Sequence, residues 1–322
     1  MDKKNDQIIN WLLEEEEPSI RYRTLTELLD YPMDNEKVIS AKKAVANCKN
    51  VERIFSRRND KGIFPHKPEY YGNFTTFNYL TSLVELGITK DDGRIFPIVD
   101  WILTPGDEKR EHFIQKEFQD EHAYLLDESN LGGCRQVNFL STLVRLGYLD
   151  DPRVKRLIDA FIEKCRFDGG YLCKWKKSRH KGQEAKSCYI ATVPALFLYS
   201  VLPNSYWKGK KFKDLINYFT SRKMIYSKIE PGKIICDTNF GLFSNGLSHI
   251  IMIAYSMSKL GLGNIPEMKT IWDIVKDKPT INGKYMLERE DYKKAILMDK
   301  KGQPNKWITF YILLSKKYKE KL

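Results

Sequence analysis

The chain has 322 residues, of which 42% are hydrophobic, and it carries a formal net charge of +12 at pH 7. Its composition excludes two classes of protein: no stretch approaches the roughly 20 apolar residues of a membrane span, and its six cysteines are too scattered for a disulfide scaffold. The excess of positive charge favours an anionic partner, but no aromatic stacking motif accompanies it, so we expect no nucleic-acid binding. Because Glu14 to Glu17 arrive before any signal-peptide core could form, we expect a cytoplasmic protein.

The first 58 residues are the least regular part of the sequence. Residues 18–29 are predicted to form a helix, with Pro18 in its first turn, where the missing N–H has no helical partner to lose. We therefore expect residues 1–58 to form N-terminal helices that pack on a repeat region, and residues 59–322 to form that region as a single structural unit. The helix at 18–29 also resembles one helix of a HEAT-type unit, which leaves an open helical solenoid as an alternative.

From residue 59 onward, four helix-like runs end in nearly the same way, about 58 residues apart, which is typical of stacked copies of one unit. Their last leucines are Leu86, Leu146, Leu202 and Leu260. A glycine or a proline follows each leucine, and these residues end helices. A second amphipathic run follows each of the four, at 99–103, 157–162, 215–219 and 271–275. The repeating unit is therefore predicted to be an antiparallel helix pair.

An aromatic residue recurs after the second helix of each pair. These residues are Phe64, Phe118, Tyr171, Tyr226 and Tyr285. Their spacing predicts about five units in all. Glycines precede three of them and allow a tight exit from the helix, so that the aromatic ring can pack back between neighbouring pairs.

One of these turns resembles a known family motif. The segment from Cys165 to Tyr171 resembles the QxxDGGW repeat of the terpene cyclase and protein prenyltransferase superfamily, with cysteine in place of glutamine and tyrosine in place of tryptophan. The longer stretch 132–173 is similar to uncharacterised bacterial squalene cyclase-like (prenyltransferase-like) proteins. This resemblance implies an all-α fold, an α/α toroid of about five to six helix pairs around a central cavity. It also implies that the protein binds or processes an isoprenoid-like or other apolar ligand, although a shared fold does not fix the activity.

The acids that perform the superfamily's best-known reactions are missing. No DxDD motif is present to protonate an alkene, and no DDxxD cluster is present to hold magnesium against a diphosphate. The pair Asp150-Asp151 precedes Pro152 in a predicted turn between helices. These absences argue against a conventional terpene cyclase. Whether the protein is an enzyme stays open; a transferase or a cyclase/lyase is the class that the resemblance favours.

Three residues are candidates for catalysis: Arg135, Asp237 and His249. Arg135 could clamp an anion, and His249 could act as an acid or a base. The order Cys236, Asp237, His249 resembles the zinc ligands of protein prenyltransferases, but the spacing does not match them well. Asp237 would also fit as the cap of a helix that begins before Phe240.

Polar and aromatic residues gather near the predicted starts of the first helices of the pairs. A mostly apolar cavity with a few convergent polar groups is the usual form of a ligand site. The candidates for its lining are Phe74, Phe77, Asn78, Asn138, Tyr189 and Asn245. Alternatively, the polar residues cap helices and bond across helix contacts. A helical-repeat module that binds a protein or peptide in a groove is the competing function.

Four residues at consecutive loop ends carry groups that bind zinc, namely Cys134, Cys173, His180 and Cys188. Thiolates and imidazole suit tetrahedral zinc, although the usual CxxC pairing is missing and buried structural thiols are the alternative. The neighbouring basic loop, residues 174–186, could attract an anionic group such as a diphosphate or an acidic lipid. The alternative is a solvated basic loop.

Overall fold

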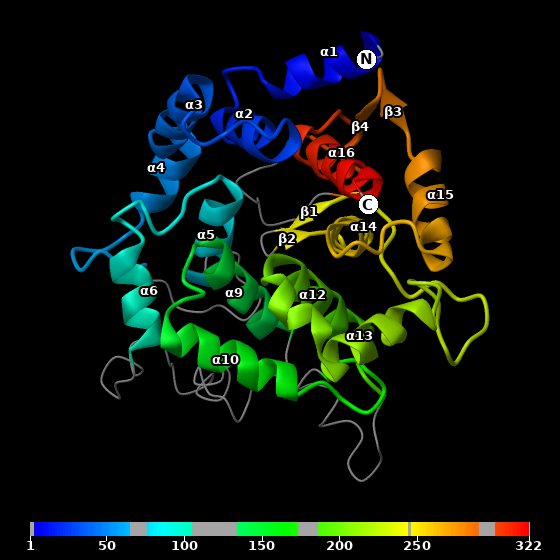
Figure 1. Cartoon of the computed structure of the whole chain (residues 1–322). Helices are drawn as coiled ribbons and strands as arrows, with labels where there is room; N and C mark the ends of the chain where they lie inside the picture. The colour runs from blue at the N-terminus through cyan, green and yellow to red at the C-terminus, as the bar shows by residue number, and fades with distance from the viewer. Residues whose placement is uncertain are drawn as a thin grey trace. The chain divides into compact units, whose positions relative to one another are not determined.

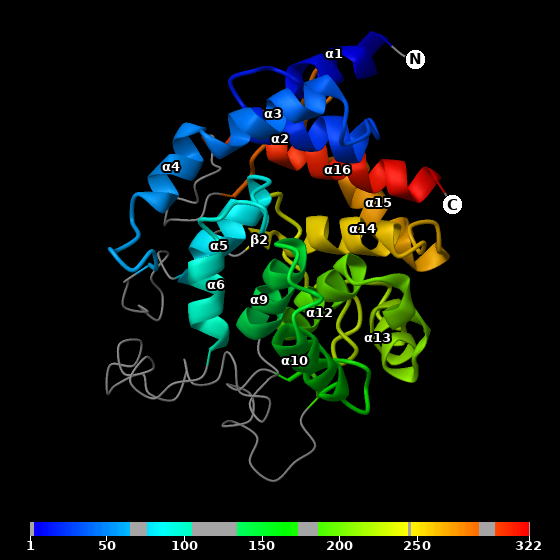
Figure 2. The same cartoon turned by 60° about the vertical axis from the view of Figure 1, so that its left-hand side comes forward.

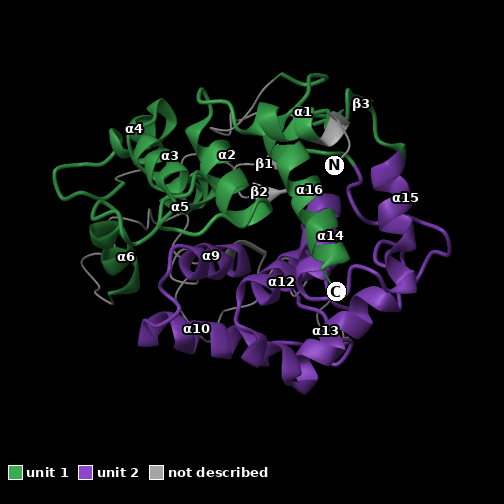
Figure 3. Cartoon of the chain, turned by 45° about the horizontal axis from the view of Figure 1, so that its top comes forward, with its two compact units in different colours: residues 1–105, 239–247, 277–321 green, residues 106–238, 248–276, 322 purple. Residues whose placement is uncertain are grey.

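The computed structural model describes residues 3–64, 76–104, 134–172, 186–243, 246–289 and 300–321. These residues are predominantly helical, as the sequence predicts (Figure 1). The chain divides into two compact units (Figure 3). Unit 1 consists of Met1–Pro105, Asn239–Leu247 and Asp277–Lys321, and unit 2 of Gly106–Thr238 and Ser248–Lys276, with Leu322. None of the described helices is both long and apolar enough to cross a bilayer.

Unit 1 joins the N-terminal helices to the C-terminal helix. Its helices are α1 (Lys3–Leu12), α2 (Pro18–Arg23), η1 (Thr24–Leu28), α3 (Glu36–Ala46), α4 (Lys49–Phe55), α5 (Thr76–Glu85), α6 (Phe96–Leu103) and α16 (Lys306–Glu320). Two short antiparallel ladders pair β1 (Leu242–Phe243) with β2 (Gly246–Leu247), and β3 (Thr280–Ile281) with β4 (Lys284–Tyr285). The helix predicted at 18–29 is confirmed, and its second half is wound as a π-helix.

The described residues of unit 2 form six α-helices that follow one another as three consecutive pairs. The described elements are α9 (Cys134–Arg145), α10 (Pro152–Glu163), α12 (Tyr189–Val201), η4 (Asn204–Lys208), α13 (Lys210–Thr220), α14 (His249–Lys259), η5 (Pro266–Met268) and α15 (Lys269–Asp277). Helix α12 packs on α9 and on α14 (Figure 2). It is buried on all sides from Ala191 to Ser200, whereas α10 and α13 bury only one stripe. Helices buried all round occupy the interior, so α12 is an inner helix of the unit.

The predicted helix ends are confirmed in detail. Gly87 and Gly147 take positive φ values of 94° and 95°, a conformation that glycine adopts without a side-chain penalty. The next amide in each case reaches back over the last turn, from Ile88 to the carbonyl of Leu83 and from Tyr148 to that of Leu143, both at 3.0 Å. These hydrogen bonds satisfy carbonyl groups that have no partner within the helix. The same motif therefore ends helices in both units.

The predicted helix start at Asp151-Pro152 is also confirmed. The Asp151 side chain accepts the amide of Arg153 at 2.9 Å, and Pro152 occupies the first turn of α10. The Arg153 guanidinium folds back on the same carboxylate and lowers the pKa of Asp151 from its ordinary value. A charged cap thus stabilises the positive end of this helix.

At two of its positions, the recurring aromatic residue fastens a turn to the start of the helix that follows. In unit 2 the Tyr171 amide donates to Thr192 Oγ1 at 3.0 Å, and its carbonyl accepts the amide of Cys188 at 2.7 Å. In unit 1 the Tyr285 amide donates to Thr309 Oγ1 at 2.9 Å, and its carbonyl accepts the amide of Asn305 at 2.9 Å. The two sites are equivalent copies. The side chains of Tyr171 and Tyr285 are also buried, as expected of core aromatic residues, whereas the packing of the rings between neighbouring pairs stays a prediction.

Candidate functional site

The structure describes part of each predicted site. Arg135 lies in the first turn of α9, and Cys134 begins that helix, but their side chains lie outside the described parts. The positions outside the described residues are Phe74, Cys173, His180 and Asn245. Phe77 is buried, whereas Asn78 and Asn138 are half-buried. No group of three candidate metal ligands is found among the described residues, and the described side chains include only Cys188 of the predicted zinc set, which stays a prediction.

Tyr189 and His249 lie together at the starts of neighbouring inner helices. Tyr189 is the first residue of α12 and His249 the first of α14, and their rings meet edge to face with centroids 6.5 Å apart. The Tyr189 hydroxyl donates to the carbonyl of Met224 at 2.9 Å. Cys236 lies near enough to Tyr189 for each group to act on the pKa of the other, and this places Asp237, the next residue, at the same end of unit 2. Three of the predicted site residues are therefore close in space.

The loop that contains Asp237 does not begin a helix, so the alternative role of Asp237 as a cap before Phe240 is wrong. The reason lies in a distant part of the chain. The amide of Phe240 donates to the carboxylate of Glu288 at 2.7 Å, and the carbonyl of Phe240 accepts the amide of Glu288 at 2.9 Å. These bonds hold the segment extended, and a helix would break them.

Burial controls the ionisation of the groups around Tyr189. It raises the pKa of the Cys236 thiol to about 12, and it raises the pKa of Tyr189 well above its ordinary value, with Cys236 adding to the effect. Both groups are therefore protonated at neutral pH and act as hydrogen-bond donors. A thiol in such surroundings is a poor nucleophile. The neutral imidazole of His249, in contrast, has one nitrogen that donates a hydrogen bond and one that accepts a hydrogen bond.

Ser248 adds an unusual feature to this end of α14. It occupies the N-cap position and is fully buried, yet its side chain makes no capping bond and its hydroxyl has no partner among the described residues. A buried hydroxyl without a hydrogen bond costs about 1–3 kcal/mol. The amides of the first helical turn also point outward from this end and carry partial positive charge. An oxygen-rich ligand would satisfy both the hydroxyl and the amides.

The Asp-Gly-Gly-Tyr turn forms a second polar cluster in unit 2. The Asp168 carboxylate accepts the amide of Ser187 at 3.0 Å, the hydroxyl of Ser187, and the amide of Gly170 at 3.3 Å. Burial acts to raise the pKa of Asp168, but these hydrogen bonds outweigh it and lower the pKa from its usual 3.8. The bonds to Ser187 join the turn to the segment that begins α12, and the bond to Gly170 closes the turn itself. Asp168 therefore has a structural role, which is to hold the conformation of the turn.

Asp168→Asn is expected to lower the free energy of unfolding by about 1–3 kcal/mol at neutral pH, because bonds to a charged acceptor become bonds to a neutral one. A depressed folded-state pKa gives stability that is complete above the unfolded value of 3.8 and is lost as pH falls through the folded pKa. The difference in the free energy of unfolding between wild type and variant, measured by urea unfolding, should therefore become smaller below about pH 4. A difference that stays constant across this range would contradict the charged role of Asp168.

Unit 1 contains a buried ionic cluster that the sequence pattern did not predict. Arg23 of α2 bonds Glu85 of α5 and the hydroxyl of Tyr311 of α16, both at 2.9 Å, and it bonds Glu27 through two further nitrogens. The guanidinium also lies 4.8 Å from the centroid of the Phe310 ring. Burial alone would lower the pKa of Arg23, but Glu27, Tyr311 and Glu85 raise it well above its ordinary value. One signal was available: Glu85 is a charged residue inside an apolar run.

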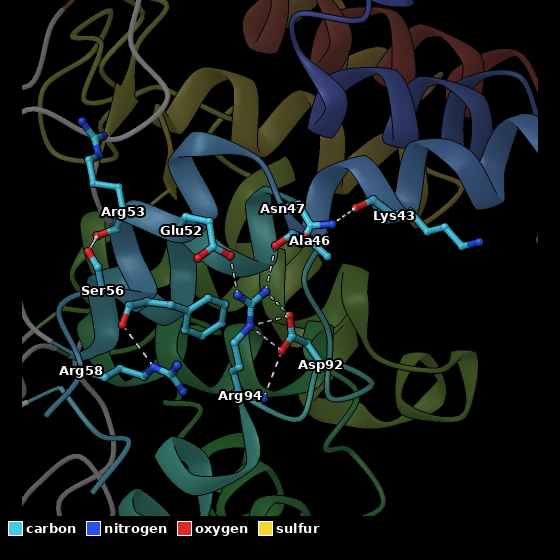
Figure 4. Close-up of polar contacts among 10 residues, drawn as sticks. Lys43, Ala46, Asn47, Glu52, Arg53, Ser56, Arg58, Asp92 and Arg94 are labelled. Atoms are coloured by element: carbon cyan, nitrogen blue, oxygen red, sulfur yellow. Dashed lines mark hydrogen bonds and ion pairs between the residues drawn. The ribbon is translucent and has the colours of Figure 1, made fainter. Parts of the chain in front are cut away.

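A more exposed cluster surrounds Arg94 in the same unit (Figure 4). Its guanidinium bonds Glu52 at 2.6 Å, Asp92 at 2.7 Å and the carbonyl of Ala46 at 2.9 Å, and lies 4.1 Å from the centroid of the Phe55 ring. Hydrogen bonds to Arg94 lower the pKa of Asp92 although its burial acts to raise it. The cluster joins α4 to the turn before α6, which is a structural role.

The grouping of Ser248, His249, Tyr189 and Cys236 is thus the arrangement best suited to a ligand, whereas the Asp168, Arg23 and Arg94 clusters are satisfied by their own partners. In the comparisons with known proteins, no family model, no curated protein and no solved structure matches this chain.

Proposed function

We propose that this chain is an α/α-toroid protein of five to six helix pairs that binds an isoprenoid-like, apolar ligand with an anionic, oxygen-rich head group. The head group would lie at the start of α14, where Ser248 and His249 can donate hydrogen bonds to its oxygens. The observation that carries the proposal is the buried Ser248 hydroxyl without a partner among the described residues. Native proteins rarely leave such a group unsatisfied. Ser256 and Ser258 of the same helix share this feature, but only Ser248 lies at the helix start beside backbone donors that have no partner within the helix, where a ligand could supply the acceptor.

The surroundings of Ser248 support both halves of such a ligand. The start of α14 offers amide donors and partial positive charge, a combination that suits phosphate and carboxylate groups. Beyond His249, the helix continues with Ile250, Ile251 and Met252, all buried. Tyr189 adds an aromatic face beside the imidazole. Anionic and apolar recognition would therefore meet at one helix end, which is the usual division of labour in a small-molecule site.

Binding rather than a particular reaction is what these residues support. His249 and the protonated Tyr189 can hold or move a proton near the head group. The missing DxDD and DDxxD motifs leave no reason to assign cyclisation. The expected activity is therefore recognition of a prenyl diphosphate or a related amphipathic anion.

Ser248→Ala is expected to weaken binding of farnesyl diphosphate about tenfold, the equivalent of one lost hydrogen bond to a charged group. The same change should raise the free energy of unfolding of the ligand-free protein by about 1 kcal/mol, because it removes an unsatisfied buried hydroxyl and no capping bond is lost. Isothermal titration calorimetry and urea unfolding measure the two effects. Their opposite signs distinguish a ligand-binding hydroxyl from a structural one.

Ser258→Ala is the matched control, because Ser258 lies in the same helix and its hydroxyl is also buried without a partner. It should raise stability in the same way and leave binding unchanged. Farnesol and inorganic diphosphate, titrated separately, show which half of the ligand contributes more. If farnesyl diphosphate does not bind the wild type, or binds it and Ser248→Ala equally, the proposal is wrong.

A further inference from the structure

Large apolar side chains are exposed at the end of unit 2 where α12 begins. Phe167 is 66% exposed, Ile190 54%, Ile229 69% and Ile234 46%. Single exposed apolar residues are ordinary on a protein surface, but a group of them marks an interaction site. The question is therefore whether the four belong to one surface.

Hydrogen bonds place them on neighbouring segments. Phe167 precedes Asp168, whose carboxylate holds Ser187, three residues before Ile190. Tyr189, next to Ile190, bonds the carbonyl of Met224, where the following loop leaves α13 and its turn. That loop folds back on itself, since Tyr226 pairs with Ile234 and the amide of Ser227 donates to the carbonyl of Lys233 at 2.8 Å. Ile229 lies in the bend of this loop and Ile234 on its returning arm.

Positive charge lies among these apolar residues. Lys186 and Lys228 are exposed, and Lys228 is near enough to Arg222 and Lys186 for their charges to act on it. Burial lowers the pKa of Lys228, the charges of Arg222 and Lys186 act in the same direction, and Asp168 opposes them. The acidic side chains on the same segments, Asp168 and Glu230, are outnumbered by the basic ones, which include Lys186, Arg222, Lys228 and Lys233. The surface therefore presents a net positive field.

We propose that this isoleucine–lysine surface, formed by Phe167, Ile190, Ile229, Ile234, Lys186 and Lys228, docks the protein on a bilayer that contains anionic lipid. The apolar side chains would enter the interface while the lysine ammonium groups remain among the phosphates. Long lysine stems suit this arrangement, because the aliphatic part can lie along apolar material with the charge in the head-group layer. Each lysine near an anionic surface adds attraction that falls off within a Debye length.

The composition of the surface favours a bilayer over a protein partner. The buried centres of protein interfaces are enriched in tyrosine, tryptophan and arginine and depleted in lysine. Here lysines stand beside isoleucines, which is the pattern of interfacial membrane-binding segments. This proposal goes beyond ligand binding at Ser248 and uses different side chains, so either one can fail without the other.

Co-sedimentation with vesicles tests the proposal. The wild type should bind vesicles that contain about one third phosphatidylserine and should bind pure phosphatidylcholine much more weakly, since lysines supply part of the attraction. Ile229→Asp should weaken binding to the anionic vesicles about tenfold, because an apolar side chain is replaced by a charge of the wrong sign. Lys228→Glu should weaken it several-fold and make the residual binding less sensitive to salt.

Two matched variants separate this surface from the general basicity of the chain. Ile281→Asp changes an isoleucine of similar exposure, 50%, in unit 1, and Lys61→Glu changes an exposed lysine there. Both should leave vesicle binding within about twofold of the wild type, since only non-specific charge is altered. The proposal is overturned if the wild type does not sediment with anionic vesicles, or if Ile229→Asp and Ile281→Asp behave alike. It is also overturned if Ile229→Asp instead dissociates a dimer in light scattering, since the surface would then bind a second copy.

Discussion

Replacing Arg23 with methionine is expected to lower the free energy of unfolding by about 3–5 kcal/mol, which is the usual effect of removing one partner from a buried ion pair. Arg23 and Glu85 have side chains only 5% and 8% exposed, and their contact is 2.9 Å. Methionine matches much of the arginine stem but offers no charge. The carboxylate of Glu85 would then remain buried with the hydroxyl of Tyr311 as its neutral donor.

Arg94→Met is the matched control in the same unit, because Arg94 also bonds two carboxylates. Its side chain is 28% exposed, and its partner Glu52 is 56% exposed. Water can therefore solvate Glu52, while Asp92, 15% exposed, keeps its bond from the backbone amide of residue 94. The expected loss is about 1 kcal/mol. Urea unfolding followed by circular dichroism measures both variants. Equal losses would show that burial of the charge does not control the effect at Arg23.

A second variant distinguishes the buried charge from lost packing. Adding Glu85→Gln to Arg23→Met removes the buried charge that has lost its arginine and should restore about 1–2 kcal/mol of the loss. The wild type, the two single variants Arg23→Met and Glu85→Gln, and the double variant form a double-mutant cycle. The coupling free energy of this cycle isolates the interaction between the two side chains. If the double variant is as unstable as the sum of the single ones, the contact between Arg23 and Glu85 contributes little.

Local signals in the sequence predicted the helix boundaries well. A glycine with positive φ, such as Gly87 or Gly147, and a capped proline start, such as Asp151-Pro152, act on their own turn of helix, so the nearby sequence is sufficient to find them. The aromatic at Tyr171 was also found, because its spacing repeats. The threonine that it bonds, Thr192, was not found, since one hydroxyl carries no periodic signal.

Contacts between distant residues could not be predicted in this way. Arg23 and Glu85 are 62 positions apart, and Arg23 and Tyr311 are 288 apart, so no window of sequence contains them together. Helical periodicity shows which face is apolar but not which charged residue turns inward. The error at Asp237 has the same origin, because Glu288 holds the amide of Phe240 from 48 positions away.

The candidate site was predictable only in part. Tyr189 and His249 were identified because each stands at a predicted helix start, and they meet because α12 packs on α14. The hydroxyl of Tyr189 reaches the carbonyl of Met224 because the chain makes a left-handed turn there, with a φ of 68° at Met224. No feature of the sequence predicts this turn. The unsatisfied hydroxyl of Ser248 follows from packing, which the sequence pattern does not describe.

Gly169→Ala is expected to lower the free energy of unfolding by about 3–4 kcal/mol, through backbone strain and overpacking together. Gly169 has a φ of +81°, which side chains rarely adopt. A Cβ there would lie 2.0 Å from the carbonyl oxygen of Asp214 and 2.6 Å from its carbonyl carbon. Because that carbonyl is backbone within α13, it cannot rotate away as a side chain would. Either the turn or the helix must move.

Gly232→Ala separates the two causes. Gly232 lies in the same unit with nearly the same φ, +78°, but an added Cβ would meet nothing within 4 Å. Its loss should be about 1 kcal/mol, from the backbone conformation alone. The difference between the two variants in urea unfolding is then the steric cost of the close approach between the turn and α13. Similar losses at both positions would mean that the turn relaxes freely, and the close packing of Gly169 would then not explain why glycine stands in this turn.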